Sequence, residues 1–440
     1  MYRFVYLCLI NHKSIEMKKL LLFIFFIVFN LSFAQLDKVD PELVGVSSER
    51  LNRVSEISKN YVSDGRVPGI VTMIARKGKL IYFEAFGNRG VKSKVKIKKN
   101  DLFRIYSMTK PIPAIAAMQL YERGKFQLND PITKYLPELN NLKRYNSKGE
   151  LIDVKTEITM QQLLTHTAGF TYGWGGGPVD KKYGEVKLWE SDGSKEFIDK
   201  VSSLPLLFEP GTKWHYSIAV DITGVIIERL SGKTFSEYLS DNIFEPLGMK
   251  DTFFEVPNNK LNRFLPNHFY NKTNSSLGTI NEDNTKISAG SNYEKVKFYS
   301  GGGGLVSTAM DFMIFSECVR NGGIYNGKRI IGAKTLSYMT SNHLPPSIKG
   351  IGRGESPNHP SVSATKFGLG FGIVDNPNIN SVIGTKGTYS WGGAAGTIFW
   401  VDPIEEIVVV SMIQLMSSPW SLRNDLRVAT YQSLTDTYSD

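Results

Sequence analysis

Runs of β-branched and aromatic residues near both ends of the chain predict strands that pair as hairpins. Residues 70–75 and 80–86 form one such pair, joined by the short connection R-K-G-K. Residues 398–401 and 407–412 form a second pair, joined by D-P-I-E-E. Short connections between two strand-like runs are typical of β-hairpins. Residues 421–434 have a helical pattern, and we expect this last helix to lie on a sheet that both chain ends build.

The middle of the chain has mainly helical periodicity. Apolar side chains recur at helical spacing in residues 111–124 and again in residues 217–230. Thr308, followed three residues later by Asp311, predicts the start of another helix. Residues 270–286 are rich in Asn, Thr and Ser and predict an exposed loop. The pattern therefore predicts an α+β fold, in which an antiparallel sheet from both chain ends is flanked by helices and carries an inserted, mainly helical region.

The first residues have the pattern of a targeting signal. M-K-K at Met17 is followed by an unbroken apolar run, residues 20–29, and by S-F-A ending at Ala34. A basic start, an apolar run and small residues at a cleavage site predict a secretory signal peptide. We therefore expect residues 1–34 to direct export to the periplasm or the exterior, with Met17 as an alternative start and an uncleaved anchor as the other interpretation. Residues 35–440 would then form the mature domain, without a stable membrane span.

Composition excludes several classes of protein. Hydrophobic residues make up 41% and charged residues 21% of the chain, which excludes disorder as its main state. Two cysteines, Cys8 and Cys318, are too few for a disulfide scaffold or a Cys-based structural zinc site. The net charge of +10 is partly local, in the lysine-rich residues 92–99, where a solvated loop is favoured over a contact with an anionic surface. Scattered histidines indicate no metal site, and no segment resembles a nucleic-acid-binding module.

One short motif places a nucleophile beside a candidate base. In Ser107-Met108-Thr109-Lys110, serine and lysine are three positions apart, and on a helix such residues share a face with about 5–6 Å between their Cβ atoms. A serine hydroxyl becomes a good nucleophile when a base takes its proton, and lysine can do this when its surroundings keep it neutral. The alternative is an ordinary serine with a solvated lysine, because a motif with two fixed positions arises often by chance.

Further segments follow this motif in order, and together they resemble one family. They are F-R-I-Y-S-M-T-K (103–110), L-L-T-H-T-A-G-F (163–170), P-G-T-K-W-H-Y-S (210–217), E-P-L-G-M (245–249), G-G-G-G-L-V-S-T-A (301–309), F-G-L-G-F-G (367–372) and W-G-G-A-A-G-T (391–397). The chain resembles the serine β-lactamase and penicillin-binding-protein superfamily, specifically the class C β-lactamase-related serine hydrolases. The resemblance spans about residues 44–414 and implies a β-lactamase/transpeptidase-like fold.

The resemblance also implies roles for particular residues. In this family the serine of the first motif is acylated and the lysine is a base and proton shuttle, which points to Ser107 and Lys110. The tyrosine of the second motif, which assists proton transfer, matches Tyr216. The backbone N–H groups of Ser107 and Ala394 would form the oxyanion hole. The family needs no cofactor or metal for this chemistry.

Two departures from the family pattern concern substrate choice. Ile218 stands where β-lactamases have an asparagine, and it has no polar group to offer a substrate amide. Trp391-Gly392-Gly393 replaces the usual Lys-Thr-Gly, so a neutral indole stands where a cation would face a substrate carboxylate. Both changes resemble the family VIII esterases, where a W-G-G triplet occurs. The alternative is that Arg353 or Lys386 supplies the missing charge.

Other residues in or near these motifs are expected to have substrate-binding or structural roles. Tyr172 and Trp174 are expected to line an acyl pocket, together with the W-G-G triplet as substrate-binding residues. His166 is expected to have a structural role. Gly301 to Gly304 are expected to allow a tight backbone conformation. Asp221 is expected either to orient the motif tyrosine or simply to begin a helix.

The sequence therefore predicts an exported serine hydrolase that cleaves an ester, or an amide, through an acyl-enzyme on Ser107. One alternative is a β-lactamase or D,D-carboxypeptidase acting on β-lactams or peptidoglycan peptides. Another is an envelope binding protein that kept the scaffold and lost catalysis. The expected partner is a small-molecule ester or amide.

Overall fold

The structure is a computed structural model, and it describes residues 36–280, 293, 295–351 and 364–438. The described residues from Asp37 onward belong to one compact unit, Asp37–Asp440. The expected signal peptide, residues 1–34 with its alternative start Met17, lies outside the described residues, as does Arg353. Within the described part, no helix has the length and apolar character that a membrane span requires. The unit Asp37–Asp440 contains all the motifs of the predicted hydrolase domain.

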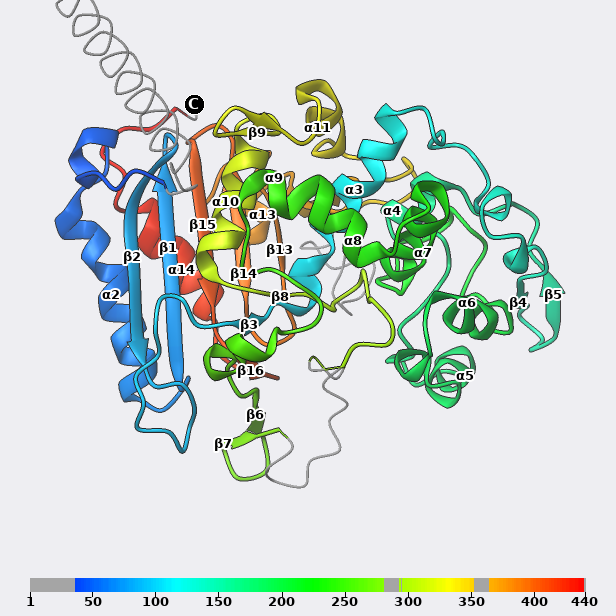
Figure 1. Cartoon of the computed structure of the whole chain (residues 1–440), viewed down its shortest axis with the longest axis horizontal. Coiled ribbons are helices and arrows are strands. Elements are labelled where there is room, and N and C mark those ends of the chain that lie inside the picture. Colours follow the sequence, from blue (N-terminus) through cyan, green and yellow to red (C-terminus); the bar gives the residue numbers. More distant parts are fainter. Residues whose placement is uncertain (1–35, 281–292, 294, 352–363, 439–440) are drawn as a thin grey trace, which may run out of the picture. The chain divides into compact units, whose positions relative to one another are not determined.

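Both chain ends build one antiparallel sheet of seven strands (Figure 1). In spatial order it contains β11 (Thr365–Phe367), β12 (Gly372–Val374), β13 (Tyr389–Gly392), β14 (Ile398–Asp402), β15 (Ile407–Met412), β1 (Gly69–Arg76) and β2 (Lys79–Gly87). Both predicted hairpins are present, as β1–β2 and β14–β15. Residues Val71 and Met412 are partners across the β1–β15 pair, which joins the two ends of the chain.

Helices cover both faces of this sheet because its central strands are buried on each side. All residues of β1, β14 and β15 are buried, which is typical of strands packed on two faces. Helices α2 (Ser48–Ser63) and α14 (Leu422–Tyr431) share one apolar core with the sheet. On the other side α10 (Ala309–Arg320) contacts β15, β14 and β1, with Phe312 against Phe399 at 5.0 Å between ring centroids. Figure 1 shows this layering around the sheet.

The chain between β2 and β11 is mainly helical, as the sequence predicts. Its α-helices besides α10 are α3 (Pro111–Glu122), α4 (Met160–Leu164), α5 (Pro178–Glu185), α6 (Ser194–Ser202), α7 (Ala219–Ser231), α8 (Phe235–Leu239), α9 (Glu245–Leu247) and α11 (Ala333–Met339); α13 (Pro377–Asn380) follows β12. Short 3-10 or π turns are η1 (Pro41–Val44), η2 (Tyr106–Thr109), η3 (Ile132–Lys134), η4 (Pro137–Leu139), η5 (Leu188–Glu190), η6 (Ser240–Phe244) and η7 (Asn258–Arg263). Helix α3 is apolar on all sides and buried against α7, so the centre of this region is itself a core.

Small sheets complete the structure and correct one expectation. They pair β3 (Phe103–Arg104) with β8 (Val306–Ser307), β4 (Lys143–Tyr145) with β5 (Leu151–Asp153), β9 (Ile324–Tyr325) with β10 (Lys328–Arg329), and β6 (His268–Asn271) with both β7 (Ser276–Thr279) and β16 (Leu415–Met416). The prediction of a plain loop at residues 270–286 is wrong up to residue 279. The polar composition there belongs to the exposed turn of a hairpin, whose β6 strand is held by β16 on its other side. Residues 281–286 lie outside the described part.

The predicted helix start at Thr308 is confirmed, and it contains a buried carboxyl group. The Thr308 hydroxyl accepts a hydrogen bond from the Asp311 N–H at 3.1 Å. The Asp311 carboxylate in turn accepts bonds from the Asp251 N–H at 2.7 Å and the Thr252 hydroxyl at 3.0 Å. Burial outweighs these bonds and raises the pKa of Asp311 to about 6.

This raised pKa predicts a pH-dependent contribution to stability. The native state binds the Asp311 proton more tightly than the unfolded chain, whose ordinary value is 3.8. Its contribution to the free energy of unfolding should therefore grow as the pH falls from about 7 to about 4, by roughly 2–3 kcal/mol. We expect wild type to gain this stability relative to Asp311→Asn, in denaturant titrations at several pH values. If the free energies of unfolding of the two proteins differ by the same amount at every pH in that range, the prediction is contradicted.

Candidate active site

Ser107 lies in a strained turn between a strand and a helix. Strand β3 leads into η2, and α3 begins directly after Lys110. Tyr106, just before the serine, has a φ of 44°, a left-handed conformation that is costly for a residue with a Cβ. Its hydroxyl accepts a hydrogen bond from the Asn267 side chain at 2.7 Å, and its ring is buried, so the surroundings hold this conformation in place. The turn leaves Ser107 partly exposed at the surface of a cavity.

Lys110 is buried beneath Ser107 and is surrounded by acceptors and aromatic faces. Its ammonium nitrogen Nζ donates to Ser107 Oγ at 3.3 Å and to the Gly302 carbonyl oxygen at 2.5 Å. The same nitrogen lies 4.4 Å from the ring centroid of Tyr216 and 5.2 Å from that of Tyr172. Aromatic faces attract a cation that has lost its water. The structure thus brings Tyr216 from a distant segment of the chain to the Ser107–Lys110 motif.

The glycine loop after Ser300 holds Lys110 from behind. The Gly302 N–H donates to Asp221 Oδ1 at 2.8 Å, and the Ser300 hydroxyl donates to the same oxygen at 2.5 Å. A Cβ atom on Gly302 would lie 2.4 Å from Asp221 Oδ2 and 2.5 Å from the Tyr172 hydroxyl oxygen. This close approach gives a physical reason for a glycine at this position, as expected for the glycine loop.

One of the two expectations for Asp221, a place at the start of a helix, is confirmed, and the other, orientation of Tyr216, is not supported by its described hydrogen bonds. Asp221 lies in the first turn of α7, but its described hydrogen bonds go to Ser300 and Gly302 and not to Tyr216. Burial raises the pKa of the Asp221 carboxyl group, and the nearby positive charge of Lys110 opposes that rise. Burial, reinforced by the same carboxyl group, raises the pKa of Tyr172 well above its ordinary value. Asp221 therefore anchors the loop that holds Lys110, a contact between distant segments that the sequence does not indicate.

Tyr216 belongs to a cluster of aromatic rings along one side of the cavity. Its hydroxyl accepts a hydrogen bond from Trp391 Nε1 at 3.3 Å, and the two rings are 5.5 Å apart. Ring centroids of Tyr172, Trp174 and Trp214 lie 5.3, 6.4 and 6.3 Å from that of Tyr216. Trp174 is stacked on Tyr172 at 4.5 Å and is 73% exposed, so it forms the rim of this aromatic wall.

His166 supports Tyr216 from the protein interior, and Ile218 is buried two residues further along the chain. His166 is buried, with its ring 5.0 Å from that of Tyr216 and its Nδ1 3.3 Å from the Ser217 hydroxyl. Burial, reinforced by the charge of Lys110, lowers the pKa of His166 well below its usual value, so the ring is neutral at ordinary pH. Ile218 is wholly buried at the start of α7. Neither side chain lines the cavity, and the His166 ring packs against the tyrosine.

The Trp391-Gly392-Gly393 triplet brings the end of β13 against the serine turn. A Cβ atom on Gly393 would lie 2.3 Å from the Ile105 carbonyl oxygen and 2.2 Å from Thr397 Oγ1. The Thr397 hydroxyl also donates to the Ile105 carbonyl at 3.2 Å. Gly393 therefore allows the turn after β13 to pack against the backbone of Ile105, two residues before Ser107. Ala394, in that turn, lines the same cavity as the serine.

These elements enclose a cavity of about 890 Å³. Seven other predicted residues line it with Ser107: Tyr172, Trp174, Tyr216, Trp391, Gly392, Gly393 and Ala394. Among the further lining residues that the sequence interpretation missed are Trp214, His215, Ser417, Ser418, Trp420, Ser421, Arg423 and Asn424. Trp214 and His215 stand in the segment that carries the motif tyrosine, so a signal existed for them. The others come from the end of the chain, where no motif marks them.

Of the two cations named as alternatives for the missing lysine, Arg353 lies outside the described residues and Lys386 is placed away from the cavity. Lys386 does not line the cavity: its side chain is 75% exposed and lies 3.5 Å from the Asp375 carboxylate. Arg423, from the first turn of α14, lines the cavity beside Gly392 instead. Over the described ranges, no group of three or more His, Cys, Asp or Glu side chains is placed to bind a metal.

Comparison with known proteins gives the same relationship along most of the chain. The beta-lactamase family profile matches residues 54–432. An uncharacterized protein of Mycobacterium tuberculosis is 30% identical over 80% of this chain and 86% of its own length. Esterase EstB of Burkholderia gladioli is 27% identical over 83% of this chain and 90% of its own length. A putative D-alanyl-D-alanine carboxypeptidase of Escherichia coli K12 is 26% identical over 87% of this chain and 86% of its own length.

Solved structures share the fold. The structure of EstCE1, described as a hydrolase with promiscuous acyltransferase activity, superposes with a TM-score of 0.71 at 24% identity, covering 87% of this chain and 99% of its own. Unliganded simvastatin synthase (LovD) from Aspergillus terreus gives a TM-score of 0.73 at 22% identity, covering 88% and 100%. The expected β-lactamase/transpeptidase-like fold is therefore confirmed.

Proposed function

From the premise that this chain belongs to the beta-lactamase family and is a serine hydrolase, we propose that it hydrolyses carboxylic esters through an acyl-enzyme on Ser107. The observation that carries the proposal is the contact of 3.3 Å between Lys110 Nζ and Ser107 Oγ at the surface of the cavity. A hydroxyl in contact with an amine, facing an open cavity, has the arrangement that nucleophilic catalysis requires. The relative named as an esterase, EstB, supports the same reaction class.

The proposed reaction has two displacement steps. For this step the Lys110–Tyr216 pair has to carry one proton fewer than an ammonium group and a phenol together. Ser107 Oγ bonds to the ester carbonyl carbon while its proton passes to this pair, and the N–H groups of Ser107 and Ala394 receive the carbonyl oxygen as it becomes negative. The tetrahedral intermediate then collapses. The carbon–oxygen bond to the alcohol breaks, and the alcohol takes the proton as it leaves. Water then attacks the acyl-enzyme carbonyl carbon and gives a proton to the same pair. The bond from this carbon to Ser107 Oγ breaks, and Ser107 takes that proton back as the acid is released.

The wall of the cavity favours esters over β-lactams. The Trp391 indole points its N–H at the Tyr216 hydroxyl and offers an aromatic face where a lysine would offer a charge. The buried Ile218 gives no hydrogen bond to a substrate amide. An ester needs neither group, because its carbonyl is held by backbone donors and its apolar parts can contact the aromatic wall.

A second candidate is a β-lactamase or D,D-carboxypeptidase activity. The Arg423 side chain favours it, because an arginine in the cavity wall offers a charge to a substrate carboxylate. The relative named as a putative D-alanyl-D-alanine carboxypeptidase is in line with this candidate.

Labelling with a fluorophosphonate probe tests the proposal on the full chain. We expect Ser107 to be labelled, and labelling to disappear in Ser107→Ala. A short-chain nitrophenyl ester should then be hydrolysed by wild type faster than a chromogenic cephalosporin. Faster turnover of the cephalosporin would favour the second candidate. Absence of labelling in wild type, with folding confirmed by circular dichroism, would favour a binding protein without catalysis.

A further inference from the structure

Arg423 is bound to the turn that carries the second oxyanion donor. Its Nη2 donates to the Gly393 carbonyl at 2.6 Å and to the Thr397 carbonyl at 3.0 Å. The guanidinium group lies against Gly392, where a Cβ atom would come within 2.9 Å of Arg423 Cζ. Gly392 thus makes room for the arginine, just as Gly393 makes room for Ile105.

The turn itself is closed by backbone bonds. The Gly393 N–H donates to the Thr397 carbonyl at 2.8 Å, and the Gly396 N–H donates to the Gly393 carbonyl at 3.1 Å. Each of these two carbonyls therefore accepts one backbone hydrogen bond and one from Arg423. The arginine joins both sides of the turn and restrains the peptide groups between them.

The Gly393 carbonyl and the Ala394 N–H belong to the same peptide group. That group is planar and trans, and no cis peptide bond occurs in the described residues, so the N–H points away from the carbonyl oxygen. A cation that holds the oxygen fixes the direction of the N–H. It also withdraws electron density through the conjugated amide, which makes the N–H a stronger donor. The arginine therefore holds the carbonyl oxygen of this peptide group, while its N–H is directed at the reacting carbonyl of the substrate.

We propose that Arg423 is a positioning residue for the reaction, which orients and polarises the Ala394 N–H that receives the developing oxyanion. The inference rests on the proposed function, because it requires the reaction at Ser107. It differs from binding a substrate carboxylate, in which Arg423 would touch the substrate itself and its loss would raise KM for anionic substrates alone.

Arginine variants of the full chain test this role with a neutral nitrophenyl ester. Removal of one oxyanion donor costs about 10²–10³ in rate, so we expect loss of its orienting cation in Arg423→Gln to lower kcat by roughly 10- to 100-fold with KM within about threefold. Arg423→Lys keeps the charge with fewer donors and should recover most of the loss. Arg53→Gln is the matched control, because Arg53 contacts Gln432 just after the same helix, from α2.

A second readout separates the oxyanion effect from a structural one. A trifluoromethyl ketone forms a tetrahedral adduct with a negative oxygen, and its affinity should weaken in Arg423→Gln by the same factor as kcat/KM. Unchanged ketone affinity, or a loss confined to KM, would overturn the inference. If Arg423→Gln does not fold, the lysine variant decides by the same two measurements. Wild type that hydrolyses no ester and escapes the fluorophosphonate would instead refute the proposed function on which the inference rests.

Discussion

The substitution Gly302→Ala should lower kcat/KM for a nitrophenyl ester by roughly 10²- to 10⁴-fold, the range that general acid–base catalysis contributes. An added methyl group would lie 2.4 Å from Asp221 Oδ2 and 2.5 Å from the Tyr172 hydroxyl oxygen, both on buried side chains. The loop has to move to relieve this contact. The Gly302 carbonyl, which accepts the Lys110 hydrogen bond at 2.5 Å, then moves with it. The lysine would lose its position beside Ser107.

The neighbouring Gly303 provides the control. A Cβ atom there would have its nearest contact at 3.6 Å, to the Tyr106 backbone, which is ordinary van der Waals distance. Gly303→Ala should therefore keep activity close to that of wild type, while both variants carry the same extra methyl group. Steady-state kinetics and thermal melts of both variants make the comparison. Equal activity of the two would show that Lys110 does not depend on the Gly302 carbonyl.

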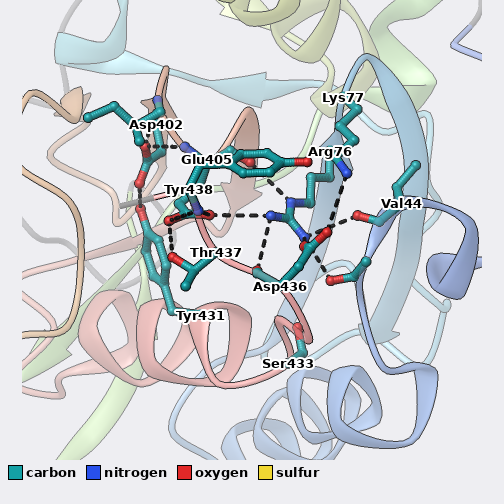
Figure 2. A network of polar contacts seen from close by, with 12 residues as sticks. Val44, Arg76, Lys77, Asp402, Glu405, Tyr431, Ser433, Asp436, Thr437 and Tyr438 are labelled. Atoms are coloured by element: carbon teal, nitrogen blue, oxygen red, sulfur yellow. Dashed lines mark hydrogen bonds and ion pairs between the residues drawn. The ribbon is translucent and has the colours of Figure 1, made fainter. Parts of the chain in front are cut away.

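The substitution Arg76→Met should destabilise the folded protein by about 3–5 kcal/mol, the usual effect of removing one partner from a buried ion pair. Arg76 ends β1 with its guanidinium group wholly buried, 3.3 Å from the buried Glu405 carboxylate (Figure 2). It also pairs with Asp436 and donates to the Gly45 carbonyl at 2.7 Å. Loss of the arginine would leave the Glu405 charge buried and would release both the N-terminal and C-terminal segments.

Thermal melts measure this effect, with an expected decrease in Tm of about 5 °C for a chain of this size. The control is Lys79→Met, because Lys79 pairs with Asp37 at the protein surface, where such pairs contribute about 0–1 kcal/mol. The double variant Arg76→Met with Glu405→Leu should regain part of the loss, since it removes the buried charge that the single variant leaves behind. A Tm for Arg76→Met within about 1 °C of wild type would contradict the prediction.

Much of the fold could be predicted because it depends on local patterns. Hairpins need only two strand-like runs and a short connection, and the observed pairs β1–β2 and β14–β15 follow from that. Helix α10 begins after Thr308 because a side-chain cap acts over three residues. The hairpin β6–β7 was not predicted because its polar turn residues have the composition of a loop. The pairing of β6 with β16 involves a segment that is far away in the sequence.

The amino-acid sequence by itself determined the family, the two hairpins of the main sheet and the pair Ser107–Lys110, since each depends on residues close together in the chain or on ordered motifs. Only the tertiary structure decided which distant residues complete the site. Asp221 and Arg423 contact it through the backbone of Gly302 and Gly393, and a contact to a backbone atom leaves no residue pattern to recognise. Their glycine partners are specified by space, because a Cβ atom at either position would overlap a neighbouring segment of the folded chain.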